Sequence, residues 1–196
     1  MNDPNMAPPE NMTDQELARR SSENPDFFGA LMERYETPLL RYIRRISSLP
    51  NEDAEDILQE TFIKTYRNIN DYDPDAKFSS WIYRIAHNQT IDTLRKRKVD
   101  SASFSIEAND AAQFLKAASD IGAETETADT LARVETIIRE LPETYREALI
   151  LRFLEEKSYE EIMDILELPK GSVATLIHRG SRLLRERMLE AGITNG

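Results

Sequence analysis

The stretch SYEEIMDILELPKGSVATLIHRGSRLLRERM, which runs from Ser158 to Met188, decides how the C-terminal part of this sequence folds. Ser158 and Glu161 have the spacing of a capping box, so a helix is expected to begin after Ser158. The Leu-Pro-Lys-Gly sequence at 168–171 predicts a turn, and a second helical pattern follows it. This arrangement is typical of a helix-turn-helix, in which one helix braces a second helix that enters the major groove of DNA.

The second helix of this pair has two distinct faces. Its predicted buried face contains Val173, Ile177, Gly180 and Leu184. A glycine within a helix costs about 1 kcal/mol relative to alanine, so Gly180 predicts a close packing contact. A helical hairpin with a solvated basic face is the alternative interpretation. The concentration of cations on the later helix of a capped, tightly turned pair favours DNA binding.

Helical patterns also fill the sequence upstream. Thr13 and Glu16 predict a second capping box, and a long helix is expected from about Phe27 to Ser48, with Pro38 as a candidate kink. The sequence EDAEDILQETFIKTYRNI predicts a helix whose apolar face is formed by Ala54, Ile57, Leu58, Thr61, Phe62 and Thr65. A further helix is expected in FSSWIYRIAHNQTIDTLRKRK, residues 78–98. No strand alternation stands out, so the predicted fold class is all-α.

The helical patterns fall into two groups, which predicts two small helical domains. The expected boundaries are a disordered lead at 1–12, a first domain at 13–98, a flexible acidic linker at 99–127, a second domain at 128–190 and a tail at 191–196. The linker is rich in small and acidic residues and has room for one short helix. Its acidic residues include Glu107, Asp110, Asp120, Glu124 and Glu126.

The composition excludes several classes of function. The chain of 196 residues has a formal net charge of -11, no cysteine and two histidines, so disulfides and thiolate metal sites are excluded and no catalytic residue, metal or cofactor is expected. Asp71, Asp73 and Asp75 resemble the start of a calcium loop, but Ala76 stands where the sharp-turn glycine belongs, so a surface loop is the better interpretation. Neither a signal peptide nor a membrane span is predicted, and a cytoplasmic protein without membrane insertion is expected.

The segment 78–98 combines aromatic residues with a cluster of arginine and lysine, although the chain as a whole is acidic. Cations can hold phosphates while flat rings stack on bases or wedge between them. An acidic surface repels DNA at long range, so contact with DNA must be local or assisted by a partner. Trp81, with apolar neighbours at helical spacing, is as suited to the domain core as to DNA.

Four motifs in order resemble one family. AEDILQETFIKTY, then FSSWIYRIAHNQTIDTLRKRK, a linker, and LPETYREALILRF leading into the helix-turn-helix resemble bacterial RNA polymerase sigma factors of the extracytoplasmic-function (ECF) type. The resemblance covers about Leu17 to Lys98 and Leu131 to Met188. It implies two domains, sigma regions 2 and 4, and an initiation subunit that is not an enzyme. Its implied partners are core RNA polymerase, through the clamp coiled coil and the flap, promoter DNA and a controlling anti-sigma factor.

The resemblance also assigns residues to three surfaces. The polymerase-docking positions are Asp56, Gln59 and Glu60. The residues implied to capture and help melt the minus-ten element are Lys77, Trp81, Arg84, Asn88, Arg95, Lys96, Arg97 and Lys98, beside a base pocket built by the loop at 70–77. The residues implied to contact the minus-thirty-five element are Lys170, Ser172, Thr175, His178, Arg179 and Arg182. The acidic linker is expected to thread through the polymerase channel.

The recognition helix departs from the family pattern, which runs Gly-Thr-Val-Lys-Ser-Arg-Leu-His-Arg-Ala. This chain has Ala174 and Leu176 where the lysine and arginine are expected. Two fewer cations should weaken phosphate contact and change the preferred minus-thirty-five sequence. The main alternative function is an autonomous helix-turn-helix regulator that binds duplex operators.

Overall fold

The structure is a computed structural model that describes residues 11–103 and 126–193. The predicted lead up to residue 10, the linker acids Glu107, Asp110, Asp120 and Glu124, and the last three residues of the predicted tail lie outside the described residues. The described helices are α1 (Asp14–Ser21), α2 (Pro25–Ser47), α3 (Asn51–Arg67), α4 (Phe78–Ser103), α5 (Glu126–Glu140), α6 (Glu143–Leu149), α7 (Tyr159–Leu166) and α8 (Lys170–Glu190). Within these ranges there is no strand, and the predicted all-α fold is confirmed.

Both predicted capping boxes are present. In α1 the Thr13 hydroxyl accepts a hydrogen bond from the Glu16 backbone N–H, and the Glu16 carboxylate accepts one from the Thr13 N–H. Ser158 and Glu161 make the same reciprocal pair of bonds at the start of α7. Each box satisfies backbone donors that have no partner within the helix, which fixes where these two helices begin.

Two prolines lie within α2. Pro25 stands at the first position of the helix, where a missing N–H costs nothing, so the helix begins two residues earlier than the apolar pattern predicted. Asn24 caps it by accepting a hydrogen bond from the Asp26 N–H. The helix then continues through Pro38 to Ser47 as one element.

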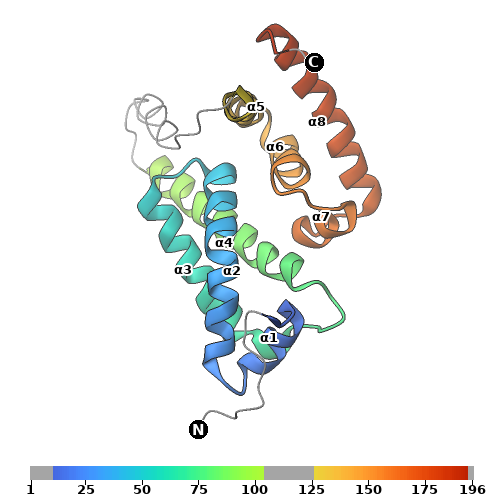
Figure 1. Cartoon of the computed structure of the whole chain (residues 1–196). Coiled ribbons are helices and arrows are strands. Elements are labelled where there is room, and N and C mark those ends of the chain that lie inside the picture. The colour runs from blue at the N-terminus through green and yellow to red at the C-terminus, as the bar shows by residue number, and fades with distance from the viewer. Residues whose placement is uncertain (1–10, 104–125, 194–196) are drawn as a thin grey trace.

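Helices α1 to α4 pack into one unit, here named the N-terminal bundle (Figure 1). Leu31, Leu39 and Ile43 of α2 and Ile82 of α4 are fully buried in it, and each such side chain contributes about 1.5–3 kcal/mol through removal from water. The six residues of the predicted apolar face of α3 are all buried. Met12, assigned from sequence to the disordered lead, is buried in the core.

Helices α5 to α8 form a second unit, here named the C-terminal bundle (Figure 1). The four predicted core residues of α8 are all buried. Gly180 lies against Leu149, because a methyl group added to this glycine would meet the Leu149 side chain at 3.1 to 3.3 Å. The close packing contact predicted from this glycine is therefore confirmed. A π-helical turn, Ile150–Leu154, extends α6 and leads to the segment before α7.

The two bundles lie against each other. Helix α4 of the N-terminal bundle packs along α7 of the C-terminal bundle, and α2 contacts the π-helical turn (Figure 1). This contact could not be predicted from helical periodicity, because periodicity identifies a buried face but not the element that covers it.

Candidate functional site

The recognition helix α8 presents a continuous exposed face. Its six predicted minus-thirty-five residues are all exposed: Lys170, Ser172, Thr175, His178, Arg179 and Arg182. Thr175 donates a hydrogen bond from its hydroxyl to the Gly171 carbonyl, and the exposed Arg182 lies 3.8 Å from Glu186. These side chains are therefore accessible to a ligand.

Leu176 gives a physical reason for one departure from the family pattern. Its side chain is half-buried and packs against the hydrophobic core. The position where an arginine was expected therefore contributes to packing. The sequence alone did not indicate this, because Leu176 lies between the two predicted faces of the helix.

Helix α3 carries the predicted docking positions on its outer side. Asp56, Gln59 and Glu60 are exposed, while Ile57 and Leu58 between them are buried. Because residues three and four apart lie on one side of a helix, the three polar side chains form a single surface strip.

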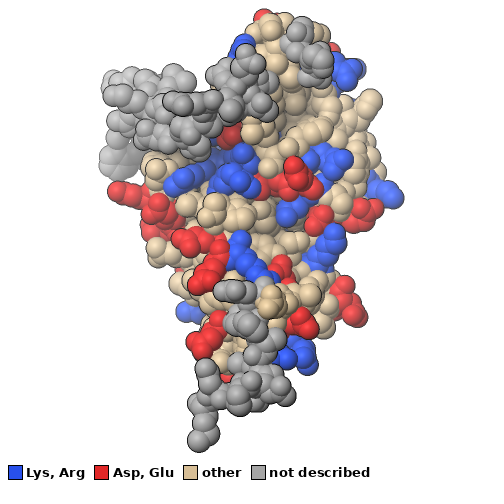
Figure 2. Space-filling view, in the orientation of Figure 1, with Lys and Arg blue, Asp and Glu red and all other residues tan. Residues whose placement is uncertain are grey.

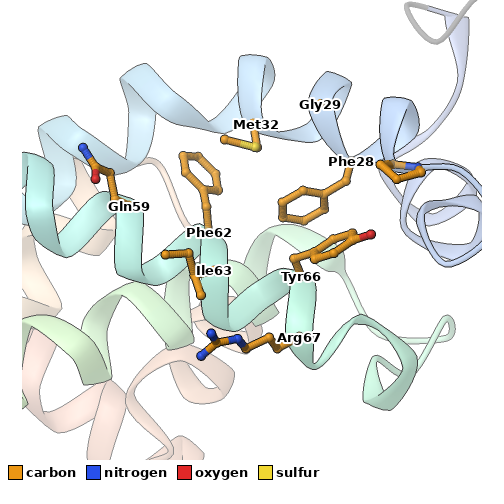
Figure 3. A pocket seen from close by; sticks show the side chains of 9 residues that line it. Phe28, Gly29, Met32, Gln59, Phe62, Ile63, Tyr66 and Arg67 are labelled. Atoms are coloured by element: carbon orange, nitrogen blue, oxygen red, sulfur yellow. The ribbon is translucent and has the colours of Figure 1, made fainter.

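An apolar groove of about 580 Å³ begins at Gln59 and runs between α2 and α3 (Figure 3). Phe28 and Met32 of α2 face Phe62, Ile63 and Tyr66 of α3 across it. Met32, Ile63 and Tyr66 are large apolar side chains that remain about two-fifths exposed. The groove and the polar strip therefore share Gln59 and form one adjoining surface.

The basic residues of α4 are spread along the helix and most are paired. Within the N-terminal bundle, Arg95 lies 3.8 Å from Asp92, and Arg97 pairs with Asp53 of α3. Asn88 and Lys96 are exposed. The helix therefore offers polar groups along much of its length, rather than one compact basic patch.

Three other cations of the predicted minus-ten set pair with carboxylates of the C-terminal bundle. Lys77 lies 3.6 Å from Glu161, Arg84 lies 4.0 Å from Glu167, and Lys98 lies 3.9 Å from Glu143. All six side chains keep contact with solvent. On the face seen in Figure 2, basic and acidic side chains alternate across the middle of the molecule.

Trp81 belongs to an aromatic cluster at the start of α4. Its ring lies 5.2 Å from that of Tyr72 and 5.7 Å from that of Phe78, and Tyr35 contacts Phe78 from α2. Trp81 is half-buried, whereas Phe78 is fully buried. The indole thus packs against the core and keeps an exposed edge beside the loop that ends at Lys77.

His87 is buried, although it is adjacent to the exposed Asn88. Its Nδ1 lies 3.0 Å from the Tyr42 hydroxyl. Burial lowers the pKa of His87 to about 4, an effect that Glu167 opposes and Arg95 reinforces. The histidine is therefore neutral at pH 7 and supports the inner side of α4.

The contact between bundles is centred on Glu155, which sequence reasoning did not identify. Glu155 lies just before α7, and its Oε1 accepts a hydrogen bond from Arg45 Nη1 at 2.7 Å. Its Oε2 accepts a hydrogen bond from the Tyr83 hydroxyl at 2.9 Å, and Arg41 lies 3.7 Å away. Burial and the nearby Glu155 raise the pKa of Tyr83. Glu155 is one of 36 aspartates and glutamates, and nothing in the sequence around it predicted this role.

Further contacts surround this carboxylate. Arg45 also donates to the Leu154 carbonyl at 3.1 Å and lies 3.4 Å from Glu135. The Lys157 ammonium lies 4.0 Å from the centre of the Tyr83 ring. Burial lowers the pKa of Lys157, while Glu161 and Glu155 oppose this effect.

Within residues 11–103 and 126–193 no cluster of three or more histidine or acidic side chains could hold a metal ion. Among the described helices none has the length and apolar character that crossing a membrane requires.

The comparisons with known proteins agree with the all-helical fold. Residues 31–99 match the family Sigma-70 region 2, and residues 131–184 match Sigma-70, region 4. The ECF RNA polymerase sigma factor SigW of Bacillus subtilis is 35% identical over 187 residues, which covers 91% of this chain and 98% of SigW. The ECF RNA polymerase sigma-E factor of Haemophilus influenzae is 31% identical over 190 residues, which covers 91% of this chain and 97% of the relative.

Two solved structures share this architecture. CnrH, in complex with the cytosolic domain of CnrY, superposes with a TM-score of 0.65 at 26% identity, and the match covers 91% of this chain and 97% of CnrH. The sigma factor RpoE of Bartonella quintana, in complex with the anti-sigma factor NepR, has the same fold, with a TM-score of 0.65 at 23% identity over 81% of this chain and 94% of RpoE. The order of the two sigma regions and the similarity along nearly the whole chain lead to one conclusion: this chain belongs to the ECF family of RNA polymerase sigma factors.

Proposed function

We propose that this chain binds core RNA polymerase, directs it to specific promoters and helps to melt the minus-ten element. The observation that carries the proposal is that the two family matches, residues 31–99 and 131–184, contain all three predicted surfaces in the expected order. The N-terminal bundle would serve as region 2 and the C-terminal bundle as region 4. Chemistry would remain with the polymerase, so this subunit would act through binding alone.

The docking surface would be the polar strip of α3. Asp56, Gln59 and Glu60 project from a helix whose opposite face is locked into the core, so a partner would meet a rigid surface. The apolar groove that begins at Gln59 would extend the buried area, because exposed apolar side chains such as Ile63 and Tyr66 gain free energy when a partner removes them from water.

The DNA-binding surfaces would divide between two helices. The exposed face of α8 would read duplex DNA at the minus-thirty-five element, with Arg179 and Arg182 available to phosphates or base edges. Helix α4 would hold the melted minus-ten strand, with Asn88 hydrogen-bonding a base edge and Lys96 neutralising phosphate. The half-buried Trp81 would offer its exposed edge to a base near the 70–77 loop.

Control by an anti-sigma factor is part of the proposal, and such control is the usual arrangement in the family. CnrH, which shares the fold and 26% of its sequence with this chain, was solved with the cytosolic domain of CnrY. A partner that covered the α3 strip or the exposed face of α8 would block initiation, because both surfaces would be needed for it.

The docking role is tested by mixing the purified chain with bacterial core RNA polymerase and measuring complex formation by size exclusion. We expect the wild-type chain to co-elute with the core enzyme and a Gln59→Ala/Glu60→Ala variant to lose at least tenfold in affinity, about 1.4 kcal/mol. Glu140→Ala, an exposed change in the C-terminal bundle, is the matched control and should bind normally. Wild-type chain that binds duplex DNA but not the core enzyme would support the autonomous regulator instead.

The minus-ten role is tested separately with an Asn88→Ala variant on a cognate promoter. Asn88 is exposed, so the substitution should leave folding and polymerase binding intact. We expect open-complex formation, followed by permanganate reactivity of unpaired thymines, to fall about fivefold to a hundredfold, as befits a lost base contact of about 1–3 kcal/mol. An unchanged yield of open complex would remove Asn88 from the proposed strand-binding surface.

A further inference from the structure

The apolar groove between α2 and α3 is open to solvent in the described part of the chain. Met32, Ile63 and Tyr66, which line it, are 40%, 43% and 41% exposed. Exposed apolar side chains that gather in one place mark an interaction surface, whereas scattered ones do not. The groove is therefore suited to receive an apolar segment.

Aromatic rings form much of the groove. The centre of the Phe28 ring lies 4.9 Å from that of Tyr66 and 6.5 Å from that of Phe62. Figure 3 shows these rings along the groove, and Arg67 is the charged residue among those that line it. Aromatic grooves suit proline-rich segments, because the extended polyproline helix is preformed and loses little entropy on binding. An acidic side chain in such a segment would also complement Arg67.

The ten residues that precede Asn11 have this composition. Their sequence, MNDPNMAPPE, is here named the N-terminal segment, and it contains three of the nine prolines of the chain and two acids but no lysine or arginine. Each proline fixes its own φ at about −65° and restricts the residue before it to extended conformations. The sequence from Ala7 to Pro9 therefore favours the polyproline shape. Met6 beside it has a thioether, which makes favourable contacts with aromatic rings.

The start of α1 brings the groove within reach of this segment. Met12 is buried in the core of the N-terminal bundle. The Asp14 carboxylate accepts hydrogen bonds from Arg34 at 2.8 Å and from the Tyr35 hydroxyl at 2.5 Å. Both partners lie on α2 within one helical turn of Met32. Ten extended residues span up to about 33 Å, whereas a helix with its side chains is about 10–12 Å across, so the segment can pass around α2.

Attachment to the same chain allows a weak contact to be occupied. A short flexible tether gives an effective concentration in the millimolar range. With about 1–10 mM of segment at the groove and a dissociation constant of about 1 mM, the groove would be filled about one half to nine tenths of the time. A contact of this strength holds without a large buried area and yields to a tighter partner.

We propose that the N-terminal segment occupies the groove between α2 and α3 and competes there with the partner that docks on α3. Met6 and the Pro8-Pro9 pair would pack on the aromatic rings, and an acid of the segment would face Arg67. Occupation of the groove is independent of the proposed function. Competition with core RNA polymerase rests on that function, because the groove adjoins the docking residue Gln59.

Occupation is tested in the full chain by nuclear magnetic resonance of methyl-labelled methionine. The chain has six methionines and no cysteine, so Asn5→Cys gives one site for a nitroxide spin label. We expect the label to remove roughly half or more of the Met32 methyl signal, in line with the expected occupancy, and to leave Met163 of the C-terminal bundle unchanged. Reduction of the nitroxide should restore the Met32 signal.

Two variants separate binding from mere attachment. Pro8→Gly/Pro9→Gly keeps the length and charge of the segment but frees both φ angles, so the Met32 signal should recover in part. Ile63→Asn removes an apolar side chain of the groove and should have the same effect. Leu131→Asn is the matched control, because Leu131 is 50% exposed on α5 and lies outside the groove.

A synthetic peptide of residues 1–11 removes the tether altogether. Added at millimolar concentration to a chain that lacks residues 2–10, it should shift the Met32 methyl signal in a saturable way. A peptide of the same composition in scrambled order should not. This measurement keeps the test decisive if a groove variant folds poorly by circular dichroism.

Competition is tested by titrating core RNA polymerase against chains labelled with a fluorophore at Glu140→Cys, an exposed site in the C-terminal bundle. Deletion of residues 2–10 should tighten binding about twofold to tenfold, because it removes an intramolecular competitor. A chain in which nine glycine and serine residues replace residues 2–10 should bind as tightly as the deletion variant. Equal affinity of all three chains would overturn the competition.

Failure of this inference and failure of the proposed function give different results. A Met32 signal that neither the spin label nor the peptide changes would overturn occupation of the groove, whatever the polymerase does. A Met32 signal that changes with protein concentration alone would assign the groove to a second copy of the chain and would also overturn it. Absence of any complex with the core enzyme for all chains would count against the proposed function, and the resonance measurements would still decide occupation.

Discussion

At the scale of single residues, two glycines in helices illustrate opposite constraints. Gly180 of α8 faces Leu149, which is fully buried and cannot retreat, whereas a methyl group at Gly29 of α2 would meet nothing within 4 Å. Alanine gains up to about 1 kcal/mol of helix propensity at either position. At position 180, crowding costs about 1–3 kcal/mol, so the net change should be destabilising.

The prediction from these two positions is a difference in sign. Gly29→Ala should raise the free energy of unfolding by about 0.5–1 kcal/mol, and Gly180→Ala should lower it by about 1 kcal/mol, as measured by urea denaturation. Each variant serves as the other's control, because the chemical change is identical. Stabilisation by Gly180→Ala would mean that the contact between α6 and α8 relaxes freely. Close packing would then not be the reason for a glycine at position 180.

At the scale of helices, periodicity in the sequence predicted the buried faces, and capping boxes predicted where two helices begin. The apolar face of α3 and the buried face of α8 were predicted residue by residue, and both capping boxes are present. Pro25 precedes the predicted start of this helix at Phe27, yet it is the first helical residue, because the missing N–H of a proline has no cost at that position. Local signals therefore located the helices well and their ends less well.

The arrangement of helices was less accessible from the sequence. The cations of α4 and of the loop before it were predicted as DNA contacts, yet nothing in their spacing indicated that Lys77, Arg84 and Lys98 face acids of the other bundle. Glu155 and Arg45 are 110 residues apart in the chain, and a single acid carries no periodic signal. Pairing between distant elements depends on the tertiary fold, so the contact between Glu155 and Arg45 became visible only in the structure.

At the scale of the whole molecule, stability should depend on pH through a buried histidine and a half-buried glutamate with opposite effects. His87 of α4 has its pKa lowered to about 4 by burial, and Glu147 of α6 has its pKa raised to about 7 by burial and by the nearby Glu143. Tyr42, Arg95 and Glu167 surround His87, while Arg146 and Arg95 partly offset the shift of Glu147. Both groups lie where α4 and α6 approach the contact between bundles.

The two signs follow from which state holds the proton. Between pH 4 and about 6.5 the unfolded chain protonates His87 and the folded chain does not, so this group makes stability rise with pH, by about 3 kcal/mol in all. Between about pH 4.5 and 7 the folded chain keeps Glu147 protonated and the unfolded chain does not, so this group makes stability fall as pH rises. In wild type the two contributions oppose each other over most of this range.

Substituting either group should therefore reveal the pH dependence of stability that the other group causes. Glu147→Gln should be more stable than wild type at pH 8 and nearly equal to it at pH 4.5, because the cost of the buried charge exists only at high pH. His87→Gln should be less stable than wild type at pH 8, because the substitution removes the packing of the imidazole. The difference should shrink at pH 5, because wild type is destabilised there by a buried histidine that resists protonation, and the variant is not. Thermal unfolding followed by circular dichroism at pH 4.5, pH 5 and pH 8 gives these differences. The two variants should change the slope of stability against pH in opposite directions. A change in the same direction would mean that at least one of the two groups is solvated in the folded chain and that α4 and α6 pack less tightly around it.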